Sequence, residues 1–410
     1  MNLPGLSWRY LWSRPLGSAL NLLLLTLGLT IVAFVLLAQD RLARAFERDL
    51  QGIDLVVGAK GSPLQLILAG VFHLDVPPGN VALGDVQALA RHPQVAQVIP
   101  LSLGDSLLTF RIVGTSPDYV TLYGAALSQG SLWTGSMQAV LGAQVARATR
   151  LSVGQTFAGA HGLGGGGHLH EDTAYTVAGV LRPCGCVLDR LVLTDTASVW
   201  AVHEGLAPGE FESLPAGDRA AIEAERDVTL ALVRYRTPLA AVSLPRLVNT
   251  TTKMQAAAPA VEITRLLSLL GVGAWVFQGV GAVLLVVAGL SVFIALWSAV
   301  RERRADIAML RMLGAPPGRV GALLLLESLW LALLACSLAL LLALGLGRMA
   351  GSLWQTGQGL IVDPWHWPSV LWSVPALSLG VALVAAALPA FSAYRVDVAS
   401  LLSSSNPSNR

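Results

Sequence analysis

The side chains best suited to coordination chemistry are concentrated in one glycine-rich stretch. From His161 to Asp172 the chain reads His-Gly-Leu-Gly-Gly-Gly-Gly-His-Leu-His-Glu-Asp. Imidazole nitrogens and carboxylate oxygens are ligands that proteins offer to Zn²⁺ and Cu²⁺. The sequence therefore contains a candidate site for Zn or Cu, whose ligands would be His161, His168, His170, Glu171 and Asp172.

A flexible loop explains the same stretch without a metal. Its spacing matches no zinc-binding signature, and a run of glycines forms a flexible chain that packs no core. Cys184 and Cys186 follow closely, and they could add thiolate ligands or close a short disulfide in an oxidising compartment. Metal binding and a solvated loop are both open interpretations of the stretch.

A second stretch has the composition of a protein-docking helix. Residues 301–315 read Arg-Glu-Arg-Arg-Ala-Asp-Ile-Ala-Met-Leu-Arg-Met-Leu-Gly-Ala, and two prolines follow. Its apolar residues share one side at helical spacing, and the glycine and prolines end the helix. Such a helix can dock in a groove on a soluble partner, whereas a simple arginine-rich membrane anchor is the alternative. The candidate contact residues are Arg303, Asp306, Ile307, Leu310, Arg311, Leu313 and Gly314.

The composition of the chain indicates the class of protein in which these residues lie. Of the 410 residues, 54% are hydrophobic and 13% are charged, against a charged share of about a quarter in soluble proteins. This balance predicts a membrane protein. The formal net charge of +2 gives no electrostatic reason to expect nucleic acid as a partner.

Four apolar stretches are long enough to cross a bilayer, whose hydrocarbon core needs about 20 helical residues. They predict spans at residues 17–38, within 266–300 (a stalk followed by the second span), at 320–346 and at 369–393. Glu327 is the one ionisable residue in their apolar cores. Proton and ion paths are usually marked by such groups inside the membrane, so we do not expect a proton-driven pump or a hydrophilic channel.

Arginines in the short segments set the orientation, because cytoplasmic loops are enriched in Lys and Arg. They predict that both termini and residues 301–319 face the cytoplasm. Residues 39–265 then form an extracytoplasmic domain, and 347–368 a short outer loop. Residues 1–16, with aromatic and arginine side chains, suit an interfacial helix among lipid headgroups, and 394–410 form a cytoplasmic tail.

The extracytoplasmic domain mixes strand and helix patterns. The sequence predicts strands at 54–57, 95–101, 175–181 and 190–194, a helix at 84–92, and a turn into a short helix at 139–146. About 225 residues can bury a core of their own, here in two subdomains. The predicted fold class is therefore an α-helical membrane protein with four transmembrane helices plus a large α+β extracytoplasmic domain of two subdomains.

Residues 301–315 resemble the ATPase-contacting segment of the FtsX-like and MacB-like ABC permease family, which includes the lipoprotein-release permeases. We call these residues the coupling stretch. Other segments fit the same family: Val113-Gly-Thr-Ser-Pro-Asp-Tyr119, Gly142–Ala146, Leu151–Gly154, Val177–Leu181 and Ala393–Leu402. The resemblance implies a homodimer of permease chains working with two ABC ATPase subunits, and contact between the coupling stretch and the ATPase. The glycine-rich histidine stretch is not recognised as a family feature.

The resemblance implies that this chain is not itself an enzyme and holds no cofactor of its own for hydrolysis. ATP and Mg²⁺ would bind the ATPase, expected on a separate polypeptide because no nucleotide-binding domain precedes the first span. We therefore predict mechanotransmission, in which ATPase motion drives the outer domain to export or extract a substrate. The alternative is a regulatory subunit that controls a periplasmic partner protein or senses a metal without transport.

Overall fold

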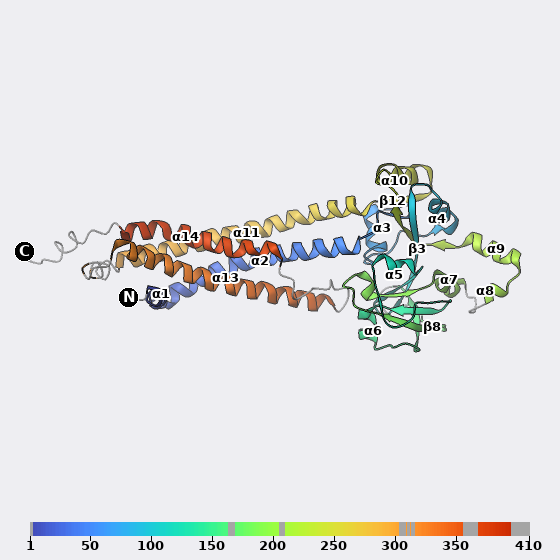
Figure 1. Cartoon of the computed structure of the whole chain (residues 1–410), viewed down its shortest axis with the longest axis horizontal. Helices are drawn as coiled ribbons and strands as arrows, with labels where there is room; N and C mark the ends of the chain where they lie inside the picture. The colour runs from blue at the N-terminus through green and yellow to red at the C-terminus, as the bar shows by residue number, and fades with distance from the viewer. Residues whose placement is uncertain are drawn as a thin grey trace, which may run out of the picture. The chain divides into compact units, whose positions relative to one another are not determined.

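The computed structural model describes residues 3–162, 169–204, 210–302, 309, 312, 316–355 and 368–394. These residues divide into two compact units, each treated by itself below. The helical unit comprises described residues of Met1–Leu42, Leu269–Leu353 and Val362–Arg410. The sheet unit comprises those of Ala43–Ser268 and Trp354–Ile361 (Figure 1).

The helical unit is built from long apolar helices. Its elements are α1 (Leu3–Leu11), α2 (Pro15–Asp49), α11 (Pro259–Glu302), α13 (Pro317–Gln355), the 3₁₀ turn η2 (Ser369–Trp372) and α14 (Ser373–Tyr394); α2 and α11 continue into the sheet unit. Four of these helical segments are long and apolar enough to cross a membrane, namely Pro15–Asp49, Pro259–Glu302, Gly318–Met349 and Ser369–Tyr394. The expectation of four transmembrane helices is confirmed.

Small side chains bring the helices of this unit close together. Leu25, Leu29 and Ala33 of α2 share a buried cluster with Ala335 and Ala339 of α13. Small residues let helix backbones approach in a membrane, where no hydrophobic force drives the helices together. Cys336 is a free buried thiol in the same cluster, in keeping with a packing role.

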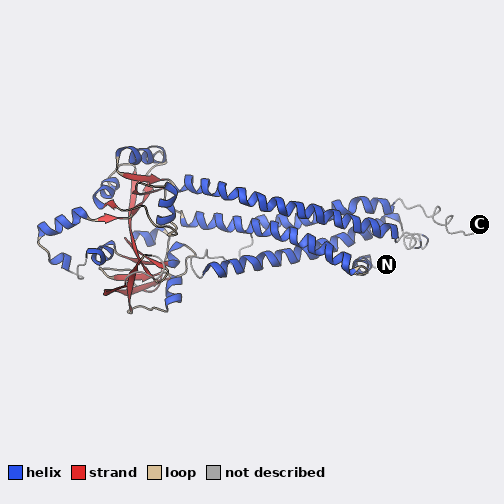
Figure 2. Cartoon of the chain, turned by 180° about the vertical axis from the view of Figure 1, so that it is seen from behind, coloured by secondary structure: helices blue, strands red, loops and turns tan. Residues whose placement is uncertain are grey.

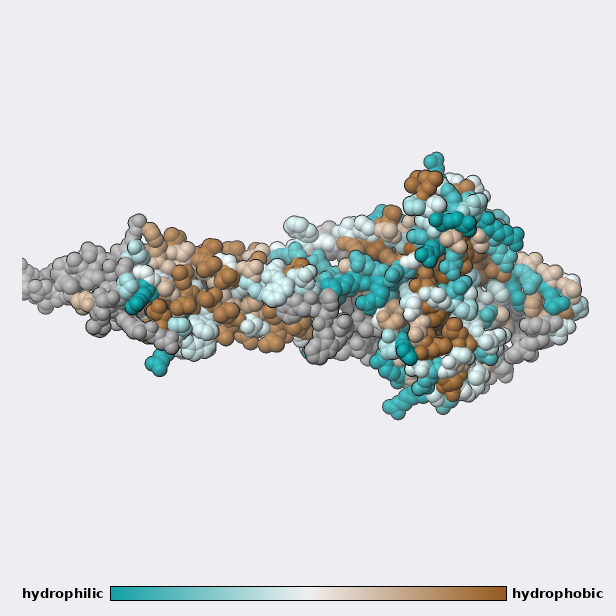
Figure 3. All heavy atoms as spheres, in the orientation of Figure 1, coloured by the Kyte–Doolittle hydropathy of each residue, from teal (hydrophilic) through white to brown (hydrophobic). Residues whose placement is uncertain are grey.

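The outer faces of the same helices expose large apolar side chains. Leu16, Val276, Leu341 and Val384 are each more than 60% exposed, and hydrophobic residues cover much of the visible face of these helices (Figure 3). In a soluble protein so large an apolar surface would need a partner. Lipid is the natural solvent for it.

The sheet unit is organised around one ten-stranded mixed sheet (Figure 2). The strand order is β12-β1-β11-β3-β4-β9-β6-β8-β5, and β7 pairs with β3 and β8. The pairs β4–β9 and β6–β8 are parallel. A separate two-stranded ladder joins β10 to β2.

The elements of the sheet unit alternate along the chain between strands and short helices. The strands are β1 (Leu55–Ala59), β2 (Val81–Ala82), β3 (Val95–Leu107), β4 (Phe110–Thr115), β5 (Leu127–Gly130), β6 (Gln138–Leu141), β7 (Thr156–His161), β8 (Leu169–Leu181), β9 (Leu191–Thr194), β10 (Asp227–Val228), β11 (Leu230–Tyr235) and β12 (Met254–Ala257). The helices are α3 (Pro63–Gly70), α4 (Leu83–Ala90), α5 (Asp118–Leu122), α6 (Ala143–Thr149), η1 (Val187–Arg190), α7 (Thr196–Glu204), α8 (Glu210–Ser213), α9 (Ala216–Glu225) and α10 (Ala240–Thr251).

Two hydrophobic cores form on this sheet. In the first, Ala240, Leu244 and Val248 recur every four residues along α10, so that one face of the helix is buried against β1, β11 and β12. The second core gathers side chains from β4, β6, β7, β8 and β9 with α6 and α7. The α+β domain is confirmed, and its two cores lie on one continuous sheet.

The glycine-rich stretch departs from its predicted form at both ends, and at the first of them His161 is the last residue of β7. The sequence predicts a loop through Asp172, yet β8 begins at Leu169. Leu169 pairs with Ala160 of β7 in an antiparallel ladder. The loop prediction is therefore wrong for 169–172, because pairing with a neighbouring strand outweighs the local glycine-rich composition.

Candidate functional site

The last residues of α2, Ala43–Asp49, are bound tightly into the sheet unit. The Phe46 and Phe72 rings meet edge to face with centroids 4.9 Å apart. The Asp49 carboxylate accepts the Val187 backbone N–H at 3.0 Å, and the Arg48 guanidinium donates to the Gly185 carbonyl oxygen. Two hydrogen bonds thus connect the helix end to the segment around η1, and a ring contact connects it to the segment that follows α3.

A disulfide shapes the segment that receives the helix end. Cys184 and Cys186 are bonded to each other, with their Cα atoms 5.1 Å apart. Asp189 accepts the backbone N–H of Cys184 at 3.0 Å through Oδ1 and that of Gly185 at 2.8 Å through Oδ2. Gly185 has φ of +66°, a conformation that glycine adopts without strain. Because the two sulfurs are bonded, they are not thiolate ligands for a metal in this structure.

Polar side chains pack around the joint, as we call the contact between Ala43–Asp49 and the segment Cys184–Asp189. The Tyr123 hydroxyl donates to the Asp49 carbonyl oxygen at 2.9 Å, and Arg190 donates to the Phe72 carbonyl oxygen at 2.9 Å. His73 Nε2 lies 3.1 Å from the Tyr119 hydroxyl. Burial, followed by the charges of Arg111 and Arg190, lowers the pKa of His73 well below its ordinary value. His73 is therefore held neutral inside the joint.

The helical unit contains a partly polar cavity of about 340 Å³. The Ser291 hydroxyl donates to Asn21 Oδ1 at 2.6 Å, and Arg14 pairs with Glu302. Glu327 also lines this cavity and is 8% exposed. The acid predicted within the third span thus borders a polar space between helices.

Three side chains with metal-ligand chemistry meet in the sheet unit. Asp105 lies on β3, His161 ends β7, and His203 is in the last turn of α7. One ligand atom from each lies within 4.8 Å of the others. His161 Nδ1 is 3.0 Å from Asp105 Oδ1, and the imidazole rings of His161 and His203 are stacked at an interplanar angle of 29°, with centroids 5.2 Å apart.

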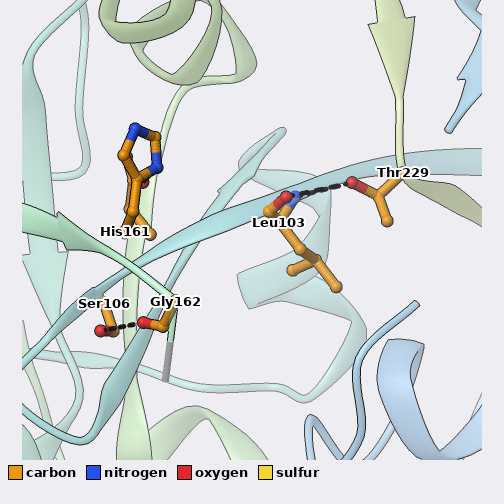
Figure 4. Close-up of polar contacts among 6 residues, drawn as sticks. Leu103, Ser106, His161, Gly162 and Thr229 are labelled. Atoms are coloured by element: carbon orange, nitrogen blue, oxygen red, sulfur yellow. Dashed lines mark hydrogen bonds and ion pairs between the residues drawn. The ribbon is translucent and has the colours of Figure 1, made fainter. Parts of the chain in front are cut away.

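The backbone positions these three side chains through strand register. Asp105 pairs with His161 in the antiparallel β3–β7 ladder. The β3–β4 register shifts between Leu103 and Ser106, the kind of bulge that redirects a side chain. Thr229 bonds to Leu103 on one side of the shift, and Ser106 donates to the Gly162 carbonyl on the other (Figure 4). Asp105 is therefore fixed from both sides.

The predicted metal ligands are only partly represented in this cluster. His161 belongs to it, whereas His168 lies outside the described residues, as do the side chains of His170, Glu171 and Asp172. Asp105 and His203 were missed, because strand pairing and α7 bring them to His161 from distant parts of the chain. His203 is exposed, while His73 is buried.

The predicted ATPase-contact residues all lie outside the described part of the chain. These residues are Arg303, Asp306, Ile307, Leu310, Arg311, Leu313 and Gly314. The described helices flank them, since α11 ends at Glu302 and α13 begins at Pro317. Their role as a coupling segment stays a prediction from sequence.

Comparison with protein families accounts for most of the chain. Residues 18–234 match the MacB-like periplasmic core domain, and residues 279–398 match the FtsX-like permease C-terminal region. The pyoverdine export ATP-binding/permease protein PvdT of Pseudomonas fluorescens (strain Pf0-1) is 25% identical over 152 residues. That match covers 34% of this chain and 22% of the relative, so less than a quarter of the relative's length is represented.

Two solved structures resemble part of the chain at low identity. The periplasmic region of MacB from Actinobacillus actinomycetemcomitans is 13% identical, and the match covers 53% of this chain and 95% of that one, with a TM-score of 0.35. The extracellular domain of the noncanonic ABC-type transporter YknZ from Gram-positive bacteria is 14% identical. Its match covers 50% of this chain and 98% of that one, with a TM-score of 0.30.

Proposed function

Since this chain belongs to the FtsX-like ABC transporter permeases with a MacB-like periplasmic core domain, we propose that it works by mechanotransmission. Motion of a separate ABC ATPase reaches the sheet unit through the long helices. The sheet unit then exports or extracts a substrate from the periplasm or the membrane surface. This mechanism does not require a channel for small molecules through the helices.

The observation that carries the proposal is the length of α2 and α11, together with the anchoring of α2. They contain 35 and 44 residues, which at 1.5 Å per residue correspond to about 53 Å and 66 Å. The hydrocarbon core of a bilayer is only about 30 Å thick. An unbroken helix keeps its backbone hydrogen bonds, so it can carry a displacement over that length. At its end, α2 engages the sheet unit through Phe46, Arg48 and Asp49.

We propose that residues 301–319 receive the motion from the ATPase. Two permease chains, as a homodimer, would bind two ATPase subunits that hold ATP and Mg²⁺. The protein would lie in the bacterial inner membrane with both termini in the cytoplasm, as the distribution of arginines indicates. The apolar spacing of Ile307, Leu310 and Leu313 supports docking rather than simple anchoring.

A regulatory role is the second candidate. It is favoured by the cluster of Asp105, His161 and His203, which could make the sheet unit responsive to a metal. In that case the same motion would control a periplasmic partner protein, and no substrate would cross. Copurification of a periplasmic enzyme whose activity follows ATP hydrolysis would support this candidate over transport.

The proposal can be tested in nanodiscs with the copurifying ATPase. A nitroxide label at Ala148→Cys, an exposed position on α6, in a Cys336→Ala background reports the distance between two sheet units. We expect ATP and Mg²⁺ to shift this distance, and an Arg311→Ala, Leu313→Ala variant to lose the shift while retaining the ATPase. An unchanged shift in that variant would refute the coupling assignment.

A further inference from the structure

We propose that Asp105, His161 and His203 form a binding site for one divalent transition-metal ion in the sheet unit, with Zn²⁺ as the best-matched ion. This site goes beyond the proposed mechanical function and does not depend on it. The described residues include one group of at least three close metal-ligand side chains, and it is this one. Two residues of the group come from outside the glycine-rich stretch that the sequence marks.

The chemistry of the donors fits zinc. Two imidazoles and one carboxylate form a common three-ligand set for Zn²⁺, with a fourth position left to water or another ligand. Mg²⁺ and Ca²⁺ instead favour shells made of oxygen. Since both sulfurs of Cys184 and Cys186 are in a disulfide, the nitrogen and oxygen donors define the site.

The ligand atoms of the cluster need to move only a short way to reach the spacing of a zinc site. Ligands about 2.1 Å from a tetrahedral zinc lie about 3.4 Å from one another. The Asp105 Oδ1 to His161 Nδ1 distance of 3.0 Å is already close to that value. The widest separation in the cluster is within 4.8 Å. Rotation of the exposed His203 side chain, at the end of α7, can bring its nitrogen inward without moving a strand.

An ordinary hydrogen-bonded pair explains only part of the geometry. Asp105 and His161 alone could form such a pair. The His203 ring, however, also stacks on that of His161, over a position where the strand carries no side chain. A Cβ atom at Gly104 would come within 3.1 Å of His203 Nε2. Glycine at this position therefore leaves room for the third ligand.

The three ligands also differ in their exposure to solvent in a way that suits a metal site. Asp105 is 3% exposed. His161 and His203 are exposed. The carboxylate thus lies inside and the two imidazoles at the surface, where an ion can enter.

Two of the three ligands, Asp105 and His161, are positioned by contacts that do not involve the metal. The β3–β7 pairing aligns Asp105 with His161, and the hydrogen bonds of Leu103 and Ser106 hold the strand on either side. Preorganised ligands lose little conformational freedom on binding, which favours affinity. His168, His170, Glu171 and Asp172 are not needed for this site, so their contribution can be tested separately.

The test uses the full chain in nanodiscs, stripped with a chelator and titrated with Zn²⁺ by calorimetry. We expect one high-affinity ion per chain. His161→Gln and His203→Gln should each weaken binding by about tenfold or more, an effect typical of lost coordination or its support. Asp105→Asn should do the same. Two controls should change the affinity by less than about threefold: His92→Gln, and a variant with His168→Gln, His170→Gln, Glu171→Gln and Asp172→Asn.

Gly104→Ala provides a second test that keeps all three ligands. The added methyl group should displace His203 and weaken zinc binding, while the titration of His92→Gln stays like that of the unmodified chain. His203→Gln alters an exposed residue, so folding of that variant is expected. Absence of micromolar Zn²⁺ binding to the unmodified chain would overturn the proposal. Unchanged affinity in the variants of Asp105, His161 and His203, or loss confined to the four-residue loop variant, would do the same.

Discussion

The Asp49 carboxylate, at the end of α2, accepts the backbone N–H of Val187 at 3.0 Å. Both groups are buried, and the bond joins the last helical turn to the segment that follows the disulfide. Arg48 and Phe46 add a hydrogen bond and a ring contact beside it. Any displacement of this helix end must therefore either carry the sheet unit with it or break these interactions.

Replacing Asp49 by alanine should destabilise the sheet unit. The change leaves the buried Val187 N–H without its acceptor, and an unsatisfied buried polar group costs about 1–3 kcal/mol. Thermal unfolding in detergent should show a lower midpoint. Asp49→Asn keeps an acceptor oxygen of the same shape and is the matched control. Equal midpoints for the alanine variant and the unmodified chain would mean that the bond contributes nothing.

Removing the disulfide should loosen the receiving segment more than it lowers global stability. The ring closed by Cys184 and Cys186 is very short, so its loss returns little chain entropy to the unfolded state. In Cys184→Ser, Cys186→Ser we expect faster amide hydrogen exchange at Val187 and nearby residues, with an unfolding midpoint close to that of the unmodified chain. Exchange that is unchanged at Val187 would show that the disulfide does not hold this segment.

Acidification should weaken the joint through His73. Its pKa is lowered in the folded state, so below the unfolded value of about 6.5 the unfolded chain binds the proton more readily. Stability is complete above about pH 6.5 and is lost as the pH falls towards the folded pKa, by up to about 1.4 kcal/mol per pH unit.

The corresponding measurement compares unfolding midpoints at pH 7.5 and 5.5. His73→Asn removes the titrating ring, and asparagine tolerates the left-handed backbone at this position, where φ is +53°. We expect the variant to lose less stability on acidification than the unmodified chain, with His92→Asn as the control. An identical loss in the unmodified chain and in His73→Asn would assign the effect to other groups.

The features that could be predicted from sequence are those set by local pattern. Apolar length gives the four spans, and the prediction of a helix at 84–92 matches α4 at Leu83–Ala90. Helical spacing depends on neighbours within a few residues, so one sequence suffices. The strand prediction at 95–101 finds only part of β3, which continues to Leu107 through a register shift. Composition does not reveal such a shift.

The sites depend on contacts between distant segments, which explains why sequence reasoning found only parts of them. His161 was noticed because it belongs to a histidine-rich stretch. Asp105 resembles any other surface aspartate until β3 pairs with β7, and His203 joins only through the position of α7. Asp49 likewise gains its role from Val187, on a segment that packs against it only in the folded chain.

The central claim is that continuous α2 and α11 carry ATPase motion to the sheet unit. Its most direct test breaks both helices with Leu42→Pro and Ser268→Pro, each of which interrupts a helix at a cost of about 3 kcal/mol. The matched control is Leu42→Ala with Ser268→Ala. The readout is the distance between labels at Ala148→Cys in the Cys336→Ala background, measured before and after ATP binding. Mechanotransmission predicts that the proline variant still binds the ATPase subunits but no longer shows the ATP-induced shift in the distance between labels. The alanine variant should keep both the binding and the shift. A full shift in the proline variant would contradict the claim.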